Sequence, residues 1–230
     1  FGPVDLNPNS ATYGHILNTP KIPWIGYDIV GSMKEALSLP IGFETDVNGS
    51  LLGEVTWGAG KGLTDVIYLT IGTGIGGGIL SGGQVVHGML HPELGHMLLA
   101  PVVGDPYPGK CPYHGNCLEG MAAGPAIEER WGHPAKDLAD REEVWELESE
   151  YLAQAISDLV LIVSPQRVIL GGGVMHQMQL FPLIREKVLR NVNGYSVTKE
   201  MQDMDSYIVP AALNDNQGVM GAIKLAMNFK

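Results

Sequence analysis

Residues 66–80, VIYLTIGTGIGGGIL, decide the fold class of this chain. Val66–Ile71 is a run of β-branched, aromatic and aliphatic residues, a composition that is typical of a buried strand. A glycine-rich turn follows, and Ile79 and Leu80 then continue the apolar pattern as a second strand. Because no helical periodicity follows the glycines, we expect a β-hairpin rather than the strand-to-helix unit of a dinucleotide-binding fold.

Apolar periodicity outside this hairpin predicts alternating helices and strands, and therefore an α/β protein. A short buried strand is expected over 40–45, a strand from 167 into the turn at Gly171–Gly173, and another at 207–209. Asp46 and Asn48 are expected to cap one of the helices. The predicted helices cover 27–39, 48–57, 119–131, 141–163, 174–190 and 218–228.

The composition narrows the possible classes of function. Hydrophobic residues make up 45% and charged residues 17% of 230, which suits a compact enzyme-like protein. The net charge of −11 would repel nucleic acids and anionic membranes, so neither is expected as a partner. No apolar stretch approaches the length of a membrane span, and no signal peptide opens the chain. Two cysteines do not make a disulfide framework, so a reducing cytoplasm is the expected location.

Two glycine clusters are candidate phosphate-binding loops. In the hairpin turn, exposed backbone N–H groups could cradle a phosphate with help from threonine hydroxyls, although a tight turn that needs positive φ is the alternative. The second cluster follows a strand, at the end where open α/β sheets bind ligands. Two such loops in one chain favour a nucleotide. The candidate residues are Thr70, Gly72, Thr73, Gly74, Gly76, Gly77, Gly171, Gly172 and Gly173.

The segments HPELGH (91–96) and CPYHGNCLEG (111–120) contain both cysteines and three histidines. Cys111 and Cys117 each lie three positions from His114, a spacing that lets one loop place two thiolates and an imidazole around a tetrahedral ion. His96 is the expected fourth ligand. The sequence therefore predicts a zinc site, and a disulfide between the two cysteines is the alternative.

Three carboxylates are candidate functional residues, and two of them, Glu93 and Glu119, lie within a few residues of a predicted zinc ligand. Asp46 could act as the general base for a hydroxyl that attacks a γ-phosphate, or as a helix cap, and the two roles are compatible. Glu93 and Glu119 could each accept hydrogen bonds from two adjacent hydroxyls, as in sugar sites, although isolated glutamates would be solvated surface residues. His91 is expected to be a turn residue, and nothing in the sequence assigns a role to His87.

These motifs resemble those of one known family. The segments are DVNGSLLGE at 46–54, IGTGIGGG at 71–78, HPELGH, CPYHGNCLEG and GPAIEERWG at 124–132. Over essentially the whole chain they look like the ROK sugar kinases, and most like the bacterial ROK fructokinases. ROK glucokinases and repressors usually have Cys-x-Cys-Gly where this chain has Cys-Pro-Tyr-His, and often Asn where it has Thr45. Both differences point to the fructokinase branch.

The resemblance implies a two-domain hexokinase/actin-like (ribonuclease H-like) fold. Residues 1–62 plus 218–230 would belong to a small N-terminal domain, and 63–217 to a large domain with the zinc loop at 91–119. The family's opening Asp-x-Gly-Gly-Thr-Lys phosphate loop does not occur in the chain, so the first domain is expected to be incomplete. A homodimer is common in the family.

The resemblance also implies an activity and residue roles. ATP with Mg²⁺ would phosphorylate a hexose, D-fructose to fructose 6-phosphate, with Asp46 as catalytic base. Gly72–Gly77 would be the second phosphate loop and Gly171–Gly173 the adenosine-side loop. The alternatives are the effector domain of a sugar-responsive ROK repressor and a zinc-stabilised sugar-binding pseudoenzyme. The expected sugar-binding residues are Asn48, Glu93, His96 and Glu119, and the expected zinc ligands are His96, Cys111, His114 and Cys117.

Overall fold

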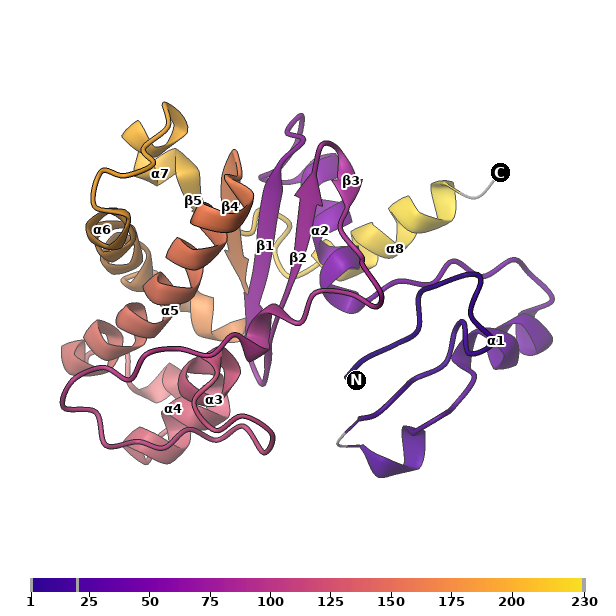
Figure 1. Ribbon diagram of the computed structural model, residues 1–230, viewed down its shortest axis with the longest axis horizontal. Coiled ribbons are helices and arrows are strands. Elements are labelled where there is room, and N and C mark those ends of the chain that lie inside the picture. The colour runs from indigo at the N-terminus through magenta and orange to yellow at the C-terminus, as the bar shows by residue number, and fades with distance from the viewer. Residues whose placement is uncertain (1, 20, 229–230) are drawn as a thin grey trace.

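A computed structural model describes residues 2–19 and 21–228, and a five-stranded mixed sheet lies at its centre (Figure 1). Phe1, Pro20 and residues 229–230, which belong to the expected small domain, lie outside the described residues. The strand order is β3-β2-β1-β4-β5. The strands are β1 (Val66–Ile71), β2 (Ile75–Ser81), β3 (Gln84–Val85), β4 (Arg167–Gly171) and β5 (Ile208–Pro210).

The predicted hairpin is confirmed, because β1 pairs antiparallel with β2. On its other side β1 pairs parallel with β4, in a register that sets Thr70 opposite Gly171. The carboxyl ends of β1 and β4 therefore meet at one edge of the sheet. This register brings the two glycine clusters, which are about a hundred residues apart in sequence, next to each other.

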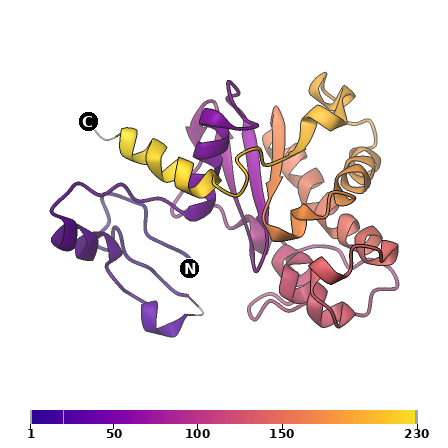
Figure 2. The same ribbon diagram turned by 180° about the vertical axis from the view of Figure 1, so that it is seen from behind.

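Successive side chains of β1 point to opposite faces of the sheet and are apolar on both, so helices cover both faces. Ile67, Leu69 and Ile71 join the larger core with α5 (Glu142–Val163), α6 (Leu180–Val192) and α3 (Leu118–Ala122). Val66 and Tyr68 pack on the other face against Leu51 of α2 (Asp46–Trp57). Figure 2 shows α2 on this face with α8 (Gln217–Met227) beside it.

The helix expected over 119–131 is interrupted. The structure has α3 and then α4 (Gly124–Trp131), with Ala123 extended between them. Pro125 explains the break, because it has no N–H to donate to the carbonyl group four residues earlier. The remaining helices are α1 (Ile29–Leu37) and α7 (Met204–Tyr207). Short 3₁₀ turns are η1 (Ile22–Trp24), η2 (Leu94–His96), η3 (Ala135–Asp137), η4 (Gly173–His176) and η5 (Glu200–Gln202).

The N-terminal segment, residues 2–45, lies beside the sheet rather than in it (Figures 1 and 2). It contains α1 and isolated bridges that join Val4 to Ile16 and His15 to Asp28. The strand predicted over 40–45 is wrong: these residues are irregular, and the Thr45 N–H bonds to the Glu44 carboxylate instead of a neighbouring strand.

None of the helices in the described part of the chain is long and apolar enough to cross a lipid bilayer.

Candidate active site

The four predicted zinc ligands converge in the structure. Their ligand atoms all lie within 4.8 Å of one another. The His96 Nδ1 atom lies 3.7 Å from Cys111 Sγ and 3.5 Å from Cys117 Sγ, and the His114 Nδ1 atom lies 3.6 Å from Cys111 Sγ. Both cysteines are free, so they do not form the alternative disulfide.

The cluster has the dimensions of a tetrahedral zinc site. Zn–S bonds of about 2.3 Å and Zn–N bonds of about 2.0–2.1 Å at tetrahedral angles separate S from N by about 3.6 Å. The observed separations of 3.5–3.7 Å match this value. Burial raises the pKa of the Cys117 thiol to about 11, and the neighbouring Cys111 thiol opposes its ionisation further. A cation at the cluster would offset both effects, so the donor set fits zinc.

Close backbone packing fixes the cysteine loop against α3. A Cβ atom on Gly120 would lie 1.8 Å from the Gly115 carbonyl oxygen, and the Lys110 N–H donates to the Gly120 carbonyl at 2.9 Å. The Cys117 Sγ atom also accepts from the Gly120 N–H at 3.4 Å, as the N-cap of α3. The short helix that carries Glu119 is therefore capped by a predicted metal ligand.

Asp46 is exposed at the first residue of α2. The sequence predicted that Asp46 and Asn48 would cap this helix, but Thr45 is the cap: its hydroxyl accepts from the Asn48 N–H at 3.1 Å. The Asp46 carboxylate bonds only locally among the described residues, accepting from the Val47 N–H at 3.0 Å. It lines a cavity of about 300 Å³ between α2 and α8.

Asn48 is buried and held by residues that the sequence did not single out. Its Nδ2 atom donates to Glu44 Oε1 at 2.9 Å, and the other oxygen of Glu44 lies 2.7 Å from His87 Nε2. Glu44 therefore joins the start of α2 to the loop after β3. In the sequence, only the position of Glu44 two residues before Asp46 indicated a role for it, because its partner His87 is 43 residues away.

The two glutamates lie near the beginning of β2. Glu119 Oε2 accepts from the Ile75 N–H at 3.0 Å. Glu93 immediately precedes η2, which packs so closely on β2 that a Cβ on Gly95 would lie 1.8 Å from the Ile75 carbonyl oxygen. Val47 of α2 contacts the same strand at Gly76. The segments that carry the predicted base Asp46, the predicted sugar glutamates and His96 thus all contact the first residues of β2.

The two glycine turns lie side by side at the sheet edge. A Cβ atom on Gly72 would lie 3.9 Å from the Gly173 nitrogen. Gly172 adopts φ +90°, and a Cβ there would lie 2.4 Å from the Ile71 carbonyl oxygen, so its conformation and its packing both require glycine. Thr70 is the second-to-last residue of β1, and Thr73 lies in the turn.

Part of the first glycine cluster is explained by packing. Gly76 and Gly77 lie within β2, and Cβ atoms there would lie 2.9 Å from Val47 and 2.6 Å from Leu69. Close approach of the helix and the neighbouring strand therefore requires glycine at both positions. Within the turn proper, the Gly72 N–H donates to the Gly74 carbonyl at 2.9 Å, so the N–H groups of Thr73 and Gly74 are the turn's candidates for a phosphate.

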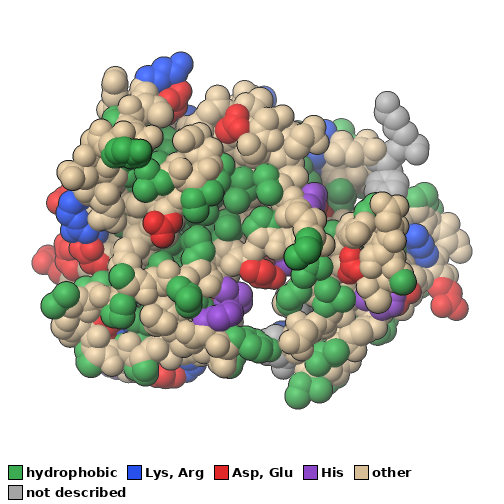
Figure 3. All heavy atoms as spheres, viewed as in Figure 1, with side chains coloured by type: hydrophobic (Ala, Val, Ile, Leu, Met, Phe, Trp, Pro, Cys, Tyr) green, Lys and Arg blue, Asp and Glu red, His purple; other side chains and the backbone are tan. Residues whose placement is uncertain are grey.

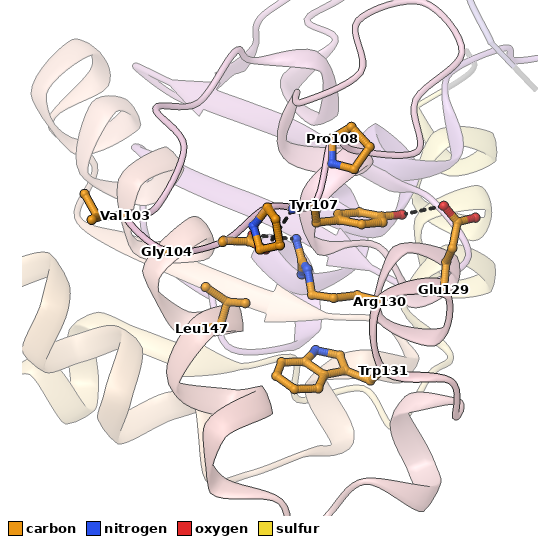
Figure 4. A pocket seen from close by; sticks show the side chains of 10 residues that line it. Val103, Gly104, Tyr107, Pro108, Glu129, Arg130, Trp131 and Leu147 are labelled. Carbon is orange, nitrogen blue, oxygen red and sulfur yellow. Dashed lines mark hydrogen bonds and ion pairs between the residues drawn. The ribbon is translucent and has the colours of Figure 1, made fainter.

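We call the predicted zinc loop, residues 91–119, the His–Cys loop. A gap runs between the body that carries this loop and the N-terminal segment, with histidine and acidic side chains beside the gap (Figure 3). A separate cavity of about 630 Å³ lies near Tyr107, Arg130 and Trp131 and includes none of the predicted site residues (Figure 4). Arg130 there is paired with Asp105 at 3.1 Å, and Tyr151 donates to the same carboxylate at 2.6 Å. These groups form an internal polar network.

Comparisons with known proteins agree with this geometry. The ROK family model matches residues 1–228. A fructokinase from Pediococcus pentosaceus is 44% identical over 226 residues, which cover 98% of this chain and 77% of the relative. The structure resembles the ROK hexokinase from Thermus thermophilus with a TM-score of 0.77 and 28% identity, covering 97% of this chain and 75% of that one.

A third similarity is to a ROK family glucokinase from Streptomyces griseus, solved in complex with glucose and AMPPNP. Its TM-score is 0.71 at 23% identity, over 92% of this chain and 76% of that chain. These matches confirm the expected α/β, actin-like fold. The extent of the family match and the identity to the fructokinase establish that the chain belongs to the ROK family.

Proposed function

We propose that the protein transfers the γ-phosphoryl group of ATP to a hexose, with D-fructose as the preferred acceptor and fructose 6-phosphate as the product. Membership of the ROK family and the identity to a named fructokinase make the protein a sugar kinase. The choice of fructose is supported by that relative and by the His-Pro-Glu and Cys-Pro-Tyr-His segments. ATP is supported by the AMPPNP complex of the related glucokinase.

The observation that carries the proposal is the position of Asp46. Its carboxylate is exposed at the start of α2, and the same helix contacts β2 just beyond the glycine turn. Phosphoryl transfer needs mainly positioning, charge neutralisation and a group that accepts the hydroxyl proton. Asp46 would accept that proton, while backbone N–H groups of the two glycine turns hold the phosphates. Mg²⁺ bound with ATP would neutralise phosphate charge.

The metal cluster would serve the sugar side. His96, Cys111, His114 and Cys117 would hold zinc, whose contribution when bound is to cross-link the loop. A four-ligand site is closed, so it has no free position for substrate. The imidazole of His96 uses Nδ1 toward the thiols, which leaves Nε2 for a sugar hydroxyl. Glu93, His96 and Glu119 would then fix the hydroxyls of the hexose, with Asn48 on the side of the base.

Three further expectations belong to the proposal. A small domain made of 1–62 plus 218–230 is supported by the packing of α8 on α2, where a Cβ on Gly53 would lie 2.4 Å from the Gln217 carbonyl oxygen. A reducing, cytoplasmic location is supported by the free thiols of Cys111 and Cys117. The homodimer rests on family resemblance, and sedimentation velocity tests it.

The decisive experiment compares wild-type protein with Asp46→Asn in a coupled assay across fructose, mannose and glucose. Loss of the base should lower kcat by about 10²- to 10⁴-fold. Asparagine is nearly isosteric and keeps the hydroxyl contact, so hexose affinity should stay within a few fold. Equal turnover of the two proteins would refute the assignment of the base. Hexose binding without any turnover of the wild type would support the pseudoenzyme alternative.

A further inference from the structure

We propose that His91 is a positioning residue of the hexose site: it holds the Glu93 carboxylate in place and links it to the N-terminal segment. This inference rests on the proposed function, in which Glu93 binds the sugar. Sequence reasoning treated His91 as a turn residue. The structure instead gives both of its ring nitrogens a polar neighbour: Val4 from the N-terminal segment and Glu93 from the same loop.

The contacts of His91 are unusual for a loop histidine. Its side chain is only 6% exposed. The Nε2 atom accepts a hydrogen bond from the backbone N–H of Val4 at 3.1 Å, across 87 residues of sequence. Val4 is itself buried and is bridged to Ile16, so the segment that donates this bond is ordered by its own pairing.

The Val4 contact determines where the imidazole proton lies. A backbone N–H can only donate, so Nε2 must present its lone pair, and the ring proton is then on Nδ1. The neighbour of Nδ1 is Glu93 Oε1, at 3.5 Å. His91 therefore presents an N–H donor to this carboxylate. The separation is longer than a formed hydrogen bond, and such contacts often tighten when substrate binds.

The side chain of Glu93 needs a neighbouring group that fixes its rotamer. Its side chain is 43% exposed, and its carboxylate has no other ion pair among the contacts of the described residues. A carboxylate that must recognise two hydroxyls binds more tightly when its rotamer is already fixed, because less conformational entropy is lost on binding. Glu119, the other proposed sugar glutamate, already has such an anchor in the Ile75 N–H. His91 would supply the equivalent for Glu93.

The other histidine of the loop between β3 and η2 makes a similar long-range link, to the residue before Thr45. His87 Nε2 lies 2.7 Å from Glu44, whose carboxylate accepts from Thr45 and Asn48 at the start of α2. The loop between β3 and η2 is therefore held to the N-terminal segment by His91 and to Glu44, which bonds the start of α2, by His87. A shift of the N-terminal segment would reach Glu93 through His91.

Two substitutions separate the positioning role from simple packing. In His91→Gln the amide oxygen can take the place of Nε2 and keep the Val4 bond, but the donor toward Glu93 is lost. We expect the KM for hexose to rise about tenfold, while the KM for ATP stays within about twofold. In His91→Asn the amide nitrogen can take the place of Nδ1. Here the hexose KM should stay within about twofold, while Tm falls by a few degrees because Val4 loses its acceptor.

The controls make the proposal falsifiable. His133→Ala removes an exposed histidine in the turn after α4 and should change neither parameter. In a Glu93→Gln background, His91→Gln should add no further loss, because its effect passes through Glu93. An unchanged hexose KM in His91→Gln, an equal rise in His91→Asn, or full additivity with Glu93→Gln would each overturn the proposal.

A spectroscopic readout keeps the inference separate from the proposed function. If the wild type phosphorylates no hexose, the proposed function fails, but the ring of His91 can still be assigned by ¹⁵N NMR. We expect the Nδ1–H tautomer, and a shift of the Glu93 carboxyl ¹³C signal in His91→Gln but not in His91→Asn. An Nε2–H tautomer, or a Glu93 signal that ignores both substitutions, would overturn the positioning role.

Discussion

The His–Cys loop packs near the start of β2, and one of the two glycine turns joins β1 to β2, but the two regions are held in place by different means. The loop brings four side-chain ligand atoms within 4.8 Å of one another, and a bound metal ion would cross-link them. In the turns, backbone register sets the geometry: β1 pairs with β4, and Gly172 passes against Ile71 with no room for a side chain. The loop, which also packs closely on α3 at Gly120, should therefore depend in addition on ligand chemistry and metal supply, whereas the turns should depend on the absence of a Cβ atom alone.

The largest expected effect comes from a substitution that disrupts only the His–Cys loop. Cys117→Ser keeps an oxygen that can still cap α3 through the Gly120 N–H but removes a zinc ligand. We expect loss of bound zinc together with a fall in hexose affinity of about 100-fold or more, since a broken structural metal site unfolds its loop. Binding of an ATP analogue should change by less than about threefold, because the turns are fixed by the sheet. Metal analysis and calorimetry with each ligand test this, and zinc loss with intact hexose binding would contradict it.

The second prediction concerns only the glycine turns and compares the same substitution at two neighbouring glycines. Gly172→Ala places a Cβ against the Ile71 backbone at φ +90° and should cost about 3 kcal/mol of unfolding free energy. Gly173→Ala meets no heavy atom within 4 Å and should change the stability by less than about 0.5 kcal/mol. Urea denaturation of both variants measures the difference. Similar stabilities would show that backbone packing does not fix this turn.

The smallest expected effect tests the residue that joins the two regions. Glu119 follows the loop in sequence, and its carboxylate accepts from Ile75 in the hairpin. Glu119→Gln keeps an acceptor for that N–H but loses charge toward the sugar, so the hexose KM should rise about threefold to tenfold. The Tm should stay within about 2 °C, because the hydrogen bond to Ile75 can be retained. A large drop in Tm would mean that the charge of Glu119 supports the hairpin rather than the substrate.

The same contrast explains what could be predicted from the sequence. The hairpin and the long helix α5 have long, regular apolar patterns, and both were found. The cluster of His96, Cys111, His114 and Cys117 was found because three of its ligands have a recognisable spacing. The strand predicted over 40–45 was wrong because a short apolar run does not specify a pairing partner. The break at Ala123 was missed although Pro125 marks it.

Contacts that depend on tertiary structure had no local signal. His91 meets Val4 across 87 residues, and His87 meets Glu44 across 43. Neither pair has a spacing that a helix or strand would repeat, so the two histidines looked like ordinary loop residues. The packing role of Gly76 and Gly77 was equally hidden, because their neighbours come from α2 and from the opposite strand.

The edges of the sheet limit the aggregation of this protein through pairing of strands from different molecules. Its outer strands, β3 and β5, are two and three residues long, and β5 ends in Pro210. A short edge with a proline offers few unpaired N–H and C=O groups to another chain. The apolar strand β1 lies inside the sheet between β2 and β4, and η2 packs against the first residue of β2, which β3 does not reach. Lengthening β3 with alternating valines would create the template for intermolecular β-sheet that the native edges withhold.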